Sequence, residues 1–205
     1  VGSEMCIRDR YGTMANECAD QLRQVGVNRP THVFVQAGVG SLAGAVIGYF
    51  TNLFPSDPPK FVVMEARAAD CLYRGALAGD GAPRIVEGDL QTIMAGLACG
   101  EPNTISWDIL RNHVSAFASC PDWVSARGMR MLGVPVKGDP VVISGESGAV
   151  GMGLLAALME TDVYRDLREA LELDRFSQVL MFSTEGNTDP MKFRKVLWDG
   201  EYPTV

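Results

Sequence analysis

A glycine-rich turn is the part of the sequence whose residue types point most directly to chemistry. It reads Ala37-Gly38-Val39-Gly40-Ser41 and lies between an apolar run and a second run of small apolar residues that reaches Phe50. Glycine adopts positive φ angles and has no Cβ, so successive backbone N–H groups can converge on an approaching ligand. The helix predicted after the turn directs the positive end of its dipole into the same space. The pattern therefore predicts an anion site, most often for a phosphate.

The spacing within the turn fits more than one role. Gly38-x-Gly40-x-x-Ala43 matches the dinucleotide-binding fingerprint, and Glu65 follows Ala43 by 22 residues, where an acid would bind a ribose hydroxyl. The glycines can equally serve only a tight turn and close helix packing. A P-loop is excluded, because no Gly-Lys-Ser/Thr sequence follows. On this turn alone, an NAD-type site, another phosphate site and a structural turn are all open.

Two other polar turns are expected close to the first. Gly145-Glu146-Ser147-Gly148 follows the apolar run 141–143, and Ser183-Thr184-Glu185-Gly186-Asn187 follows the apolar run 179–182. In parallel α/β sheets, ligands bind beyond the carboxyl ends of the strands. The turns at 38–41, 145–148 and 183–187 are therefore predicted to lie at one edge of the sheet.

The alternation of apolar and amphipathic segments predicts an α/β fold with a largely parallel sheet and helices on both faces. Residues 31–65 form one strand–helix–strand unit, which implies a parallel pair. Strands are expected at 33–35, 61–65, 84–86, 141–143 and 179–182. Helices are expected at 13–25, 41–53, 70–77, 104–110, 123–132, 146–159, 162–173 and 190–198. Thr104 or Ser106 is expected to cap the fourth helix, and Thr161 or Asp162 the seventh.

The composition excludes several classes of protein. The chain has 205 residues, 47% of them hydrophobic, a net charge of -7 and a pI of about 4.8. No cluster of Lys and Arg forms a basic face, so nucleic acid is not an expected partner. No apolar run reaches membrane-spanning length, so no membrane is expected either. The five cysteines are scattered without a C-x-x-C pair, which favours a reduced, cytoplasmic setting without zinc, another metal or a disulfide framework.

Three groups of segments together resemble the pyridoxal-phosphate enzymes of fold type II, the tryptophan synthase β-like family. They are THVFVQAGVGSLAGAVIGYF at 31–50, QTIMAGLACGEPNTISWDIL at 91–110 with VVISGESGAVGMGLL at 141–155, and the tail MFSTEGNTDP...VLWDGEYP at 181–203. The resemblance spans about Tyr11 to Pro203. Within the family it is most specific to the enzymes that act on diaminopropionate. It implies pyridoxal 5′-phosphate as cofactor and β-elimination of ammonia from 2,3-diaminopropionate, giving pyruvate and ammonia. The alternatives are a related dehydratase or sulfhydrylase acting on serine- or threonine-like amino acids, and a non-catalytic nucleotide-binding domain.

The resemblance also implies roles for individual residues. The cofactor phosphate would be held by five consecutive backbone N–H groups, those of Gly38, Val39, Gly40, Ser41 and Leu42. Ser183 or Thr184 would face the pyridine nitrogen, where a neutral hydroxyl leaves that nitrogen largely unprotonated, and Glu146 would line the ring edge. Alternatively, the Ser41 hydroxyl caps the helix, Glu146 is a solvated or capping acid, and one hydroxyl of the tail stabilises the turn. Under this resemblance Glu65 is a strand-end acid near the site.

The lysines of the sequence bear on catalysis, because the family forms a Schiff base through one. None of them stands in the family's Schiff-base context: Lys60, Lys137, Lys192 and Lys195. We therefore expect no catalytic residue in this chain, and we expect the chain to be inactive alone. The histidines His32 and His113 have no acid or nucleophile nearby in the sequence and are expected to be structural. The thiols of Cys71, Cys99 and Cys120 are expected to pack in the core.

The first ten residues, VGSEMCIRDR, show no periodic pattern and no signal-peptide core. They look like a translated adapter, so residues 1–10 are interpreted as a non-native leader and are left out of the fold prediction. Residues 11–205 are expected to be the C-terminal part of the cofactor-binding α/β domain, with the N-terminal part of the enzyme missing. The resemblance implies a small amino-acid substrate and a homodimer for the full-length protein.

Overall fold

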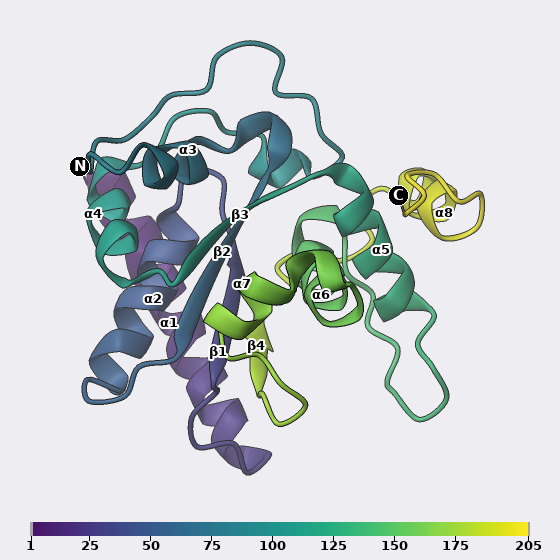
Figure 1. Cartoon of the computed structure of the whole chain (residues 1–205), viewed down its shortest axis with the longest axis horizontal. Helices are drawn as coiled ribbons and strands as arrows, with labels where there is room; N and C mark the ends of the chain where they lie inside the picture. Colours follow the sequence, from purple (N-terminus) through teal and green to yellow (C-terminus); the bar gives the residue numbers. More distant parts are fainter. Residues whose placement is uncertain (1, 205) are drawn as a thin grey trace.

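A parallel sheet of four strands forms the centre of the protein, in the order β3-β2-β1-β4 (Figure 1). The computed structural model describes the backbone of residues 2–204 and the side chains from Tyr11 onwards. The strands are β1 (His32–Gln36), β2 (Lys60–Ala66), β3 (Ala116–Cys120) and β4 (Val179–Met181). All three pairings are parallel, so the α/β fold predicted from the sequence is confirmed.

The helices occur between and after the strands. They are α1 (Gly2–Gln24), α2 (Ser41–Leu53), α3 (Cys71–Ala78), α4 (Thr104–His113), α5 (Asp122–Gly133), α6 (Glu146–Glu160), α7 (Arg165–Ala170) and α8 (Pro190–Leu197). Short 3-10 turns are η1 (Arg67–Ala69), η2 (Ala95–Leu97) and η3 (Asp162–Tyr164).

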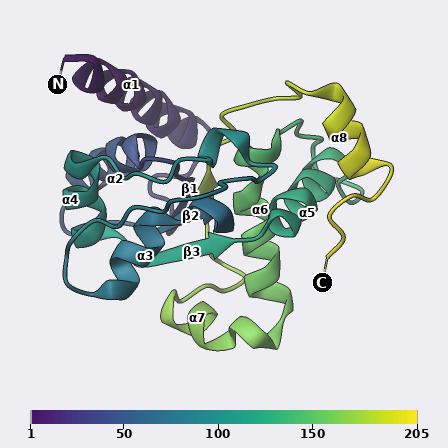
Figure 2. The same cartoon turned by 90° about the horizontal axis from the view of Figure 1, so that it is seen from above.

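Helices cover both faces of the sheet (Figure 2). Val33 and Val35 point to one core, which they share with α1, α2 and α4, whereas Phe34 points to the other core, which it shares with α5 and α6. Successive side chains of a strand point to opposite faces, so an apolar strand such as β1 must be covered on both. All five residues of β1 are buried, and its carboxyl end lies between those of β2 and β4.

The predicted strands at 141–143 and 84–86 are wrong. Val141, Val142 and Ile143 are 61%, 37% and 48% exposed and lie in the connection between α5 and α6. A strand needs a neighbouring strand with which to form a hydrogen-bond ladder, and apolar composition alone does not provide one. Residues 84–86 make one backbone hydrogen bond to another segment, from the Val86 N–H to the Gly100 carbonyl at 2.8 Å, and one bond does not form a ladder.

Strand β3 is missing from the sequence prediction, because AFASC contains no β-branched residue and few large apolar ones. It nevertheless pairs with β2 from Val62↔Ala116 to Ala66↔Cys120. The cap predicted for α4 is also corrected. The side chain of Asn103, rather than Thr104 or Ser106, caps this helix by accepting the Ser106 N–H at 2.8 Å.

Helix α1 extends further towards the N-terminus than predicted. Its backbone is helical from Gly2, although the side chains of the leader assigned to residues 1–10 lie outside the described residues. Over 13–24 the predicted helix is confirmed, and Ala15 and Ala19 are buried. Within the described residues, none of the helices has the length and apolar character needed to cross a membrane.

Candidate functional site

A cavity of about 350 Å³ lies at the carboxyl ends of β1 and β4, where the turns predicted at 38–41, 145–148 and 183–187 meet. Its walls come from α1, the end of β1, the loop after β1, the start of α2, the η2 segment and the loop after it, α6 and the tail. The wall residues are Tyr11, Gln36, Gly38, Val39, Gly40, Ser41, Leu42, Gly96, Leu97, Cys99, Ser147, Thr184 and Glu185. All five residues of the predicted phosphate cradle line it. The prediction that the three turns converge is thus confirmed.

The loop before α2 contains a row of backbone donors that find no partner in the part of the chain that the structure describes. Gly40 is the N-cap residue at φ 93°, and no side chain caps α2 or places an acid in its first turn. Within the described residues, the N–H groups of 38–42 have no hydrogen-bond acceptor, whereas the Val39 carbonyl accepts the Asn103 N–H at 2.8 Å. The loop is therefore held through its oxygen, and its nitrogens are left for a ligand. Ser41 lines the cavity and does not cap the helix.

Close packing behind the loop explains the glycine at position 38. A Cβ there would lie 3.3 Å from both the Cys99 Sγ and the Gly96 carbonyl oxygen. The η2 segment therefore presses directly on the cradle. The thiol of Cys99 is only partly buried and belongs to the cavity wall, in contrast to Cys71 and Cys120, which are buried as predicted.

The second turn forms another helix N-terminus, and a protein carboxylate already occupies it. The Ser147 N–H donates to the Glu185 Oε1 at 2.5 Å, and the Gly145 N–H donates to the Glu185 carbonyl at 3.0 Å. Glu185 therefore neutralises the positive end of α6. Two helix N-termini meet at this cavity, and the one belonging to α2 keeps its free donors.

Ser147 also places an unsatisfied hydroxyl against the cavity. The residue is 4% exposed, and its Oγ is a buried oxygen without a hydrogen-bond partner among the described residues. The same Oγ would lie 3.1 Å from a Cβ at position 96, so Gly96 leaves room for it. Burying a hydroxyl without a partner costs about 1–3 kcal/mol. A ligand in the cavity would remove this cost.

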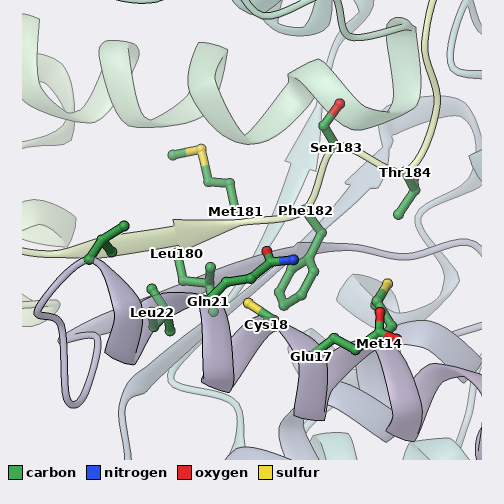
Figure 3. A pocket seen from close by; sticks show the side chains of 11 residues that line it. Met14, Glu17, Cys18, Gln21, Leu22, Leu180, Met181, Phe182, Ser183 and Thr184 are labelled. Carbon is green, nitrogen blue, oxygen red and sulfur yellow. The ribbon is translucent and has the colours of Figure 1, made fainter.

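The tail places its two candidate hydroxyls on opposite sides of the chain. In Figure 3, Ser183 points towards the pale green helix above the strand, whereas Thr184 points the other way, as Phe182 does. The Ser183 Oγ donates to the Ser144 Oγ at 2.9 Å, and Thr184 lines the cavity. Thr184 also lines the neighbouring groove between α1 and β4, about 380 Å³ in volume, which Figure 3 draws.

Glu146 lies on the first turn of α6 with its side chain 9% exposed, so it is not the solvated acid considered above. Burial is the largest influence on its carboxyl group and raises the pKa. Its carbonyl accepts the Ser125 hydroxyl from α5. It is not one of the described residues on the wall of the 350 Å³ cavity, where its neighbour Ser147 takes that position.

Glu65 caps a helix instead of facing a ligand. The residue is fully buried at the end of β2, its Oε1 accepts the Leu72 N–H at 2.9 Å and its Oε2 accepts the Tyr73 N–H at 2.6 Å. These are donors of the first turn of α3. A carboxylate enclosed in this way cannot bind a ribose hydroxyl. The acid that the dinucleotide-binding fingerprint requires after the glycine turn is therefore not available. Glu65 is the strand-end acid that the resemblance implied.

The buried carboxyl group of Glu65 predicts a pH dependence of stability. Burial raises its pKa from 4.5 to about 7, more than the bonds from Leu72 and Tyr73 lower it. The folded state therefore binds more protons than the unfolded state between these values. We expect the free energy of unfolding to fall by about 1 kcal/mol per unit as pH rises from 4.5 to 7.

Urea denaturation at pH 5, 6 and 7 measures this slope. Glu65→Gln should flatten it and lower the stability at pH 5, because the amide keeps one acceptor but turns its NH₂ group towards the second backbone donor. A slope equal in wild type and Glu65→Gln would contradict the assignment.

The wall residues Gln36, Ser147 and Glu185 are among those that the sequence analysis did not name as site residues. A glutamine at the end of an otherwise apolar strand, directly before a glycine turn, is a signal for the first of them. Ser147 and Glu185 lie inside turns that the sequence analysis placed correctly, but their direction depends on the tertiary structure. His32 is structural, as predicted, with its Nε2 bonded to the Leu171 carbonyl at 2.7 Å.

Comparison with known proteins points to the family that the sequence resembles. The model of the family described as pyridoxal-phosphate dependent enzyme matches residues 2–175. Diaminopropionate ammonia-lyase from Escherichia coli (strain K12) is 48% identical over 196 residues, which are 96% of this chain and 48% of that protein. Diaminopropionate ammonia-lyase from Salmonella typhimurium (strain LT2) is 48% identical over 195 residues, 95% of this chain and 48% of that protein.

A solved structure extends the likeness to three dimensions. The crystal structure of diaminopropionate ammonia lyase from Escherichia coli in complex with an aminoacrylate-PLP azomethine reaction intermediate matches with a TM-score of 0.83 at 47% identity. The match covers 94% of this chain and 48% of that chain. The chain thus spans about half the length of the curated relatives it matches.

Proposed function

The chain belongs to the family of pyridoxal-phosphate dependent enzymes, and we propose that it forms the phosphate-binding half of the cofactor site of an ammonia-lyase acting on 2,3-diaminopropionate. The observation that carries this proposal is the row of N–H groups at 38–42, which have no acceptor in the described part of the chain and which open into the cavity at the N-terminus of α2. The specific activity is suggested by the names of the relatives from Escherichia coli and Salmonella typhimurium.

The residues present fit pyridoxal 5′-phosphate. A phosphate needs several donors, which the cradle offers, and the dipole of α2 favours an anion there by about 0.3–1 kcal/mol. Ser147 brings a buried hydroxyl that has no partner among the described residues, and Thr184 brings a second hydroxyl from the tail. The cavity holds one charged side chain among its described wall residues, Glu185, and the N-terminus of α6 compensates it.

The chemistry and the binding would be divided between cofactor and protein. When bound, pyridoxal phosphate supplies an electron sink for amino-acid chemistry. The chain's own residues bind and orient it: 38–42 hold the phosphate, Ser147 donates its hydroxyl to the ligand, and Thr184 is the candidate contact for the ring nitrogen. The η2 segment and Gly38 close the wall behind the phosphate and exclude water there.

The lysines support the expectation that this chain binds without turnover. None of the four is among the described residues on the cavity wall. Lys60 lies at the opposite end of the sheet, where its Nζ is 3.0 Å from the Glu172 Oε2, and Lys195 pairs with Glu201. The Schiff-base lysine and the full reaction are therefore proposed to need residues outside this chain.

Ligand binding to the purified chain tests the proposed site. We expect pyridoxal 5′-phosphate to bind at least about 10-fold more tightly than pyridoxal, because charge-assisted bonds to phosphate contribute about 1.5–3 kcal/mol. Ser147→Ala should weaken binding about 3- to 10-fold, the value of one neutral hydrogen bond. Equilibrium dialysis with both ligands measures the ratio. Equal retention of pyridoxal and its phosphate would contradict the cradle.

A chemical trap tests the second part of the proposal. Borohydride reduction of the chain saturated with pyridoxal 5′-phosphate should label no lysine stoichiometrically, and the chain should release no ammonia from 2,3-diaminopropionate. Peptide mapping and an ammonia assay give the two results. Labelling of one specific lysine together with ammonia release would show that the chain is a competent enzyme, against our expectation.

A further inference from the structure

We propose that Gln36 is a positioning residue that makes the hydroxyl of Thr184 a donor towards the cavity, so that the ring nitrogen of bound pyridoxal phosphate is held unprotonated. This inference rests on the proposed function, because it concerns the same cavity. It is carried by hydrogen bonds that join the end of β1 to the segment after β4.

Gln36 is a buried amide at the last position of β1. It is 3% exposed and lines the cavity directly before the phosphate loop. The apolar residues before it in β1 pack into the two cores, so a glutamine at this position has no packing advantage. A buried amide needs polar partners, and those of Gln36 come from a segment 146 and 148 residues away in the sequence.

The direction of the Gln36 amide is fixed by chemistry. Its Nε2 lies 2.8 Å from the Phe182 carbonyl oxygen, which only accepts hydrogen bonds. The atom at that position must therefore be the NH₂ group and not the amide oxygen. The same Nε2 lies 3.0 Å from the Thr184 Oγ1, and its second hydrogen is available for that bond.

The direction of the Thr184 hydroxyl follows from that of the amide. Its Oγ1 accepts from Gln36, so its own proton cannot point there. Within the described residues, that proton has no acceptor, and Thr184 lies on the cavity wall. The hydroxyl is thus left to donate to a ligand atom with a lone pair. A pyridine nitrogen can accept such a bond only in its unprotonated form.

The other polar groups of the tail do not compete for this role. The Ser183 hydroxyl is bonded to Ser144 and points to the opposite side of the chain (Figure 3). The Oε1 of Glu185 is held by the Ser147 N–H. The choice between Ser183 and Thr184, open in the sequence, therefore falls on Thr184.

Ring-¹⁵N-labelled pyridoxamine 5′-phosphate is the probe, because it carries the phosphate and the ring nitrogen and needs no Schiff base. Its ¹⁵N chemical shift at pH 7 reports directly on protonation of the ring. Bound to the wild-type chain, it should show an unprotonated, hydrogen-bonded nitrogen. Thr184→Val should remove the hydrogen-bond shift and lower affinity about 3- to 10-fold, and Thr184→Ser should restore both.

Gln36→Glu gives the result that a merely structural role would not produce. A carboxylate at position 36 only accepts, so the Thr184 hydroxyl would turn to it and present its oxygen to the ring. The ¹⁵N signal should then move towards the protonated form. This carboxylate also faces the Phe182 carbonyl, and the repulsion between the two acceptors could disturb the end of β1. Thr184→Val therefore provides a parallel test in which β1 is unaltered. Ser183→Ala is the matched control and should leave the signal unchanged.

The outcomes separate the two proposals. If the wild-type chain does not retain the probe, both the proposed cofactor site and this inference fall. If the probe is retained with a protonated nitrogen, or if Ser183→Ala shifts the signal and Thr184→Val does not, the cofactor site stands and the role of Gln36 is overturned. A nitrogen signal that follows Thr184 and reverses with Gln36→Glu would support the inference.

Discussion

Gly40→Ala should weaken the binding of pyridoxal 5′-phosphate by at least about 10-fold. Gly40 has a φ of 93°, where an L-residue costs about 1–2 kcal/mol. Its new Cβ would also lie 3.1 Å from the Leu110 Cδ1. The loop must move to relieve either the unfavourable φ or the contact with Leu110. The N–H groups of 38–42 then no longer converge. Equilibrium dialysis of the variant measures the loss.

Gly26→Ala is the matched control for this variant. Gly26 has a similar φ of 83°, but a Cβ there meets no atom of the described residues within 4 Å. Both substitutions therefore place alanine at an unfavourable positive φ, but only Gly40 lies in the loop before α2. Gly26→Ala should lose about 1 kcal/mol of stability and retain full ligand affinity. Equal loss of affinity in both variants would mean that general destabilisation, and not the cradle, causes the effect.

Gly128→Ala should destabilise the fold by about 3 kcal/mol or more, through the packing of α5 against α6. A Cβ at position 128 would lie 2.0 Å from the Ala149 carbonyl oxygen, and one at 153 would lie 1.8 Å from the Val124 carbonyl oxygen. Both clashes are with backbone, so no side-chain rotation relieves them, and the helices must move apart. Urea denaturation gives the change in unfolding free energy.

Two further variants make this prediction specific. Gly48→Ala, within α2, places its Cβ 3.9 Å from the nearest atom and should increase stability by up to about 1 kcal/mol, because alanine favours helix. The double variant of Gly128 and Gly153 should cost less than the sum of the singles, since one separation of the helices relieves both clashes. Additive losses would argue against a shared contact.

The same packing connects stability to the site. Helix α6 carries Ser147 at its first turn, and the Ser125 hydroxyl of α5 holds the Glu146 carbonyl next to it. A shift of α6 would therefore move the second helix N-terminus at the cavity. Weaker binding of pyridoxal 5′-phosphate to Gly128→Ala, even where it is still folded, would follow from this connection.

Local patterns in the sequence determined much of the architecture. The glycine turn after β1, the parallel strand–helix–strand unit at 31–65 and the helices at 41–53, 123–132 and 190–198 were all predicted, because their signals lie within a few consecutive residues. The resemblance of segments distant in the sequence is enough to indicate the cofactor class. These features depend on the residue types within short segments and on the spacing of motifs, and not on how the elements pack.

Only the tertiary structure decided which side chains meet. Gln36 reaches Thr184 across 148 residues, and Ser147 reaches Glu185 across 38. The burial of Glu65 as a cap of α3 and the exposure of Val141–Ile143 depend on which elements lie beside them. Hydroxyl direction, access and strand pairing are properties of neighbours distant in sequence. The sequence alone therefore located the loop that is proposed to hold a phosphate, whereas the fold determined which hydroxyl and which amide line the cavity beside it.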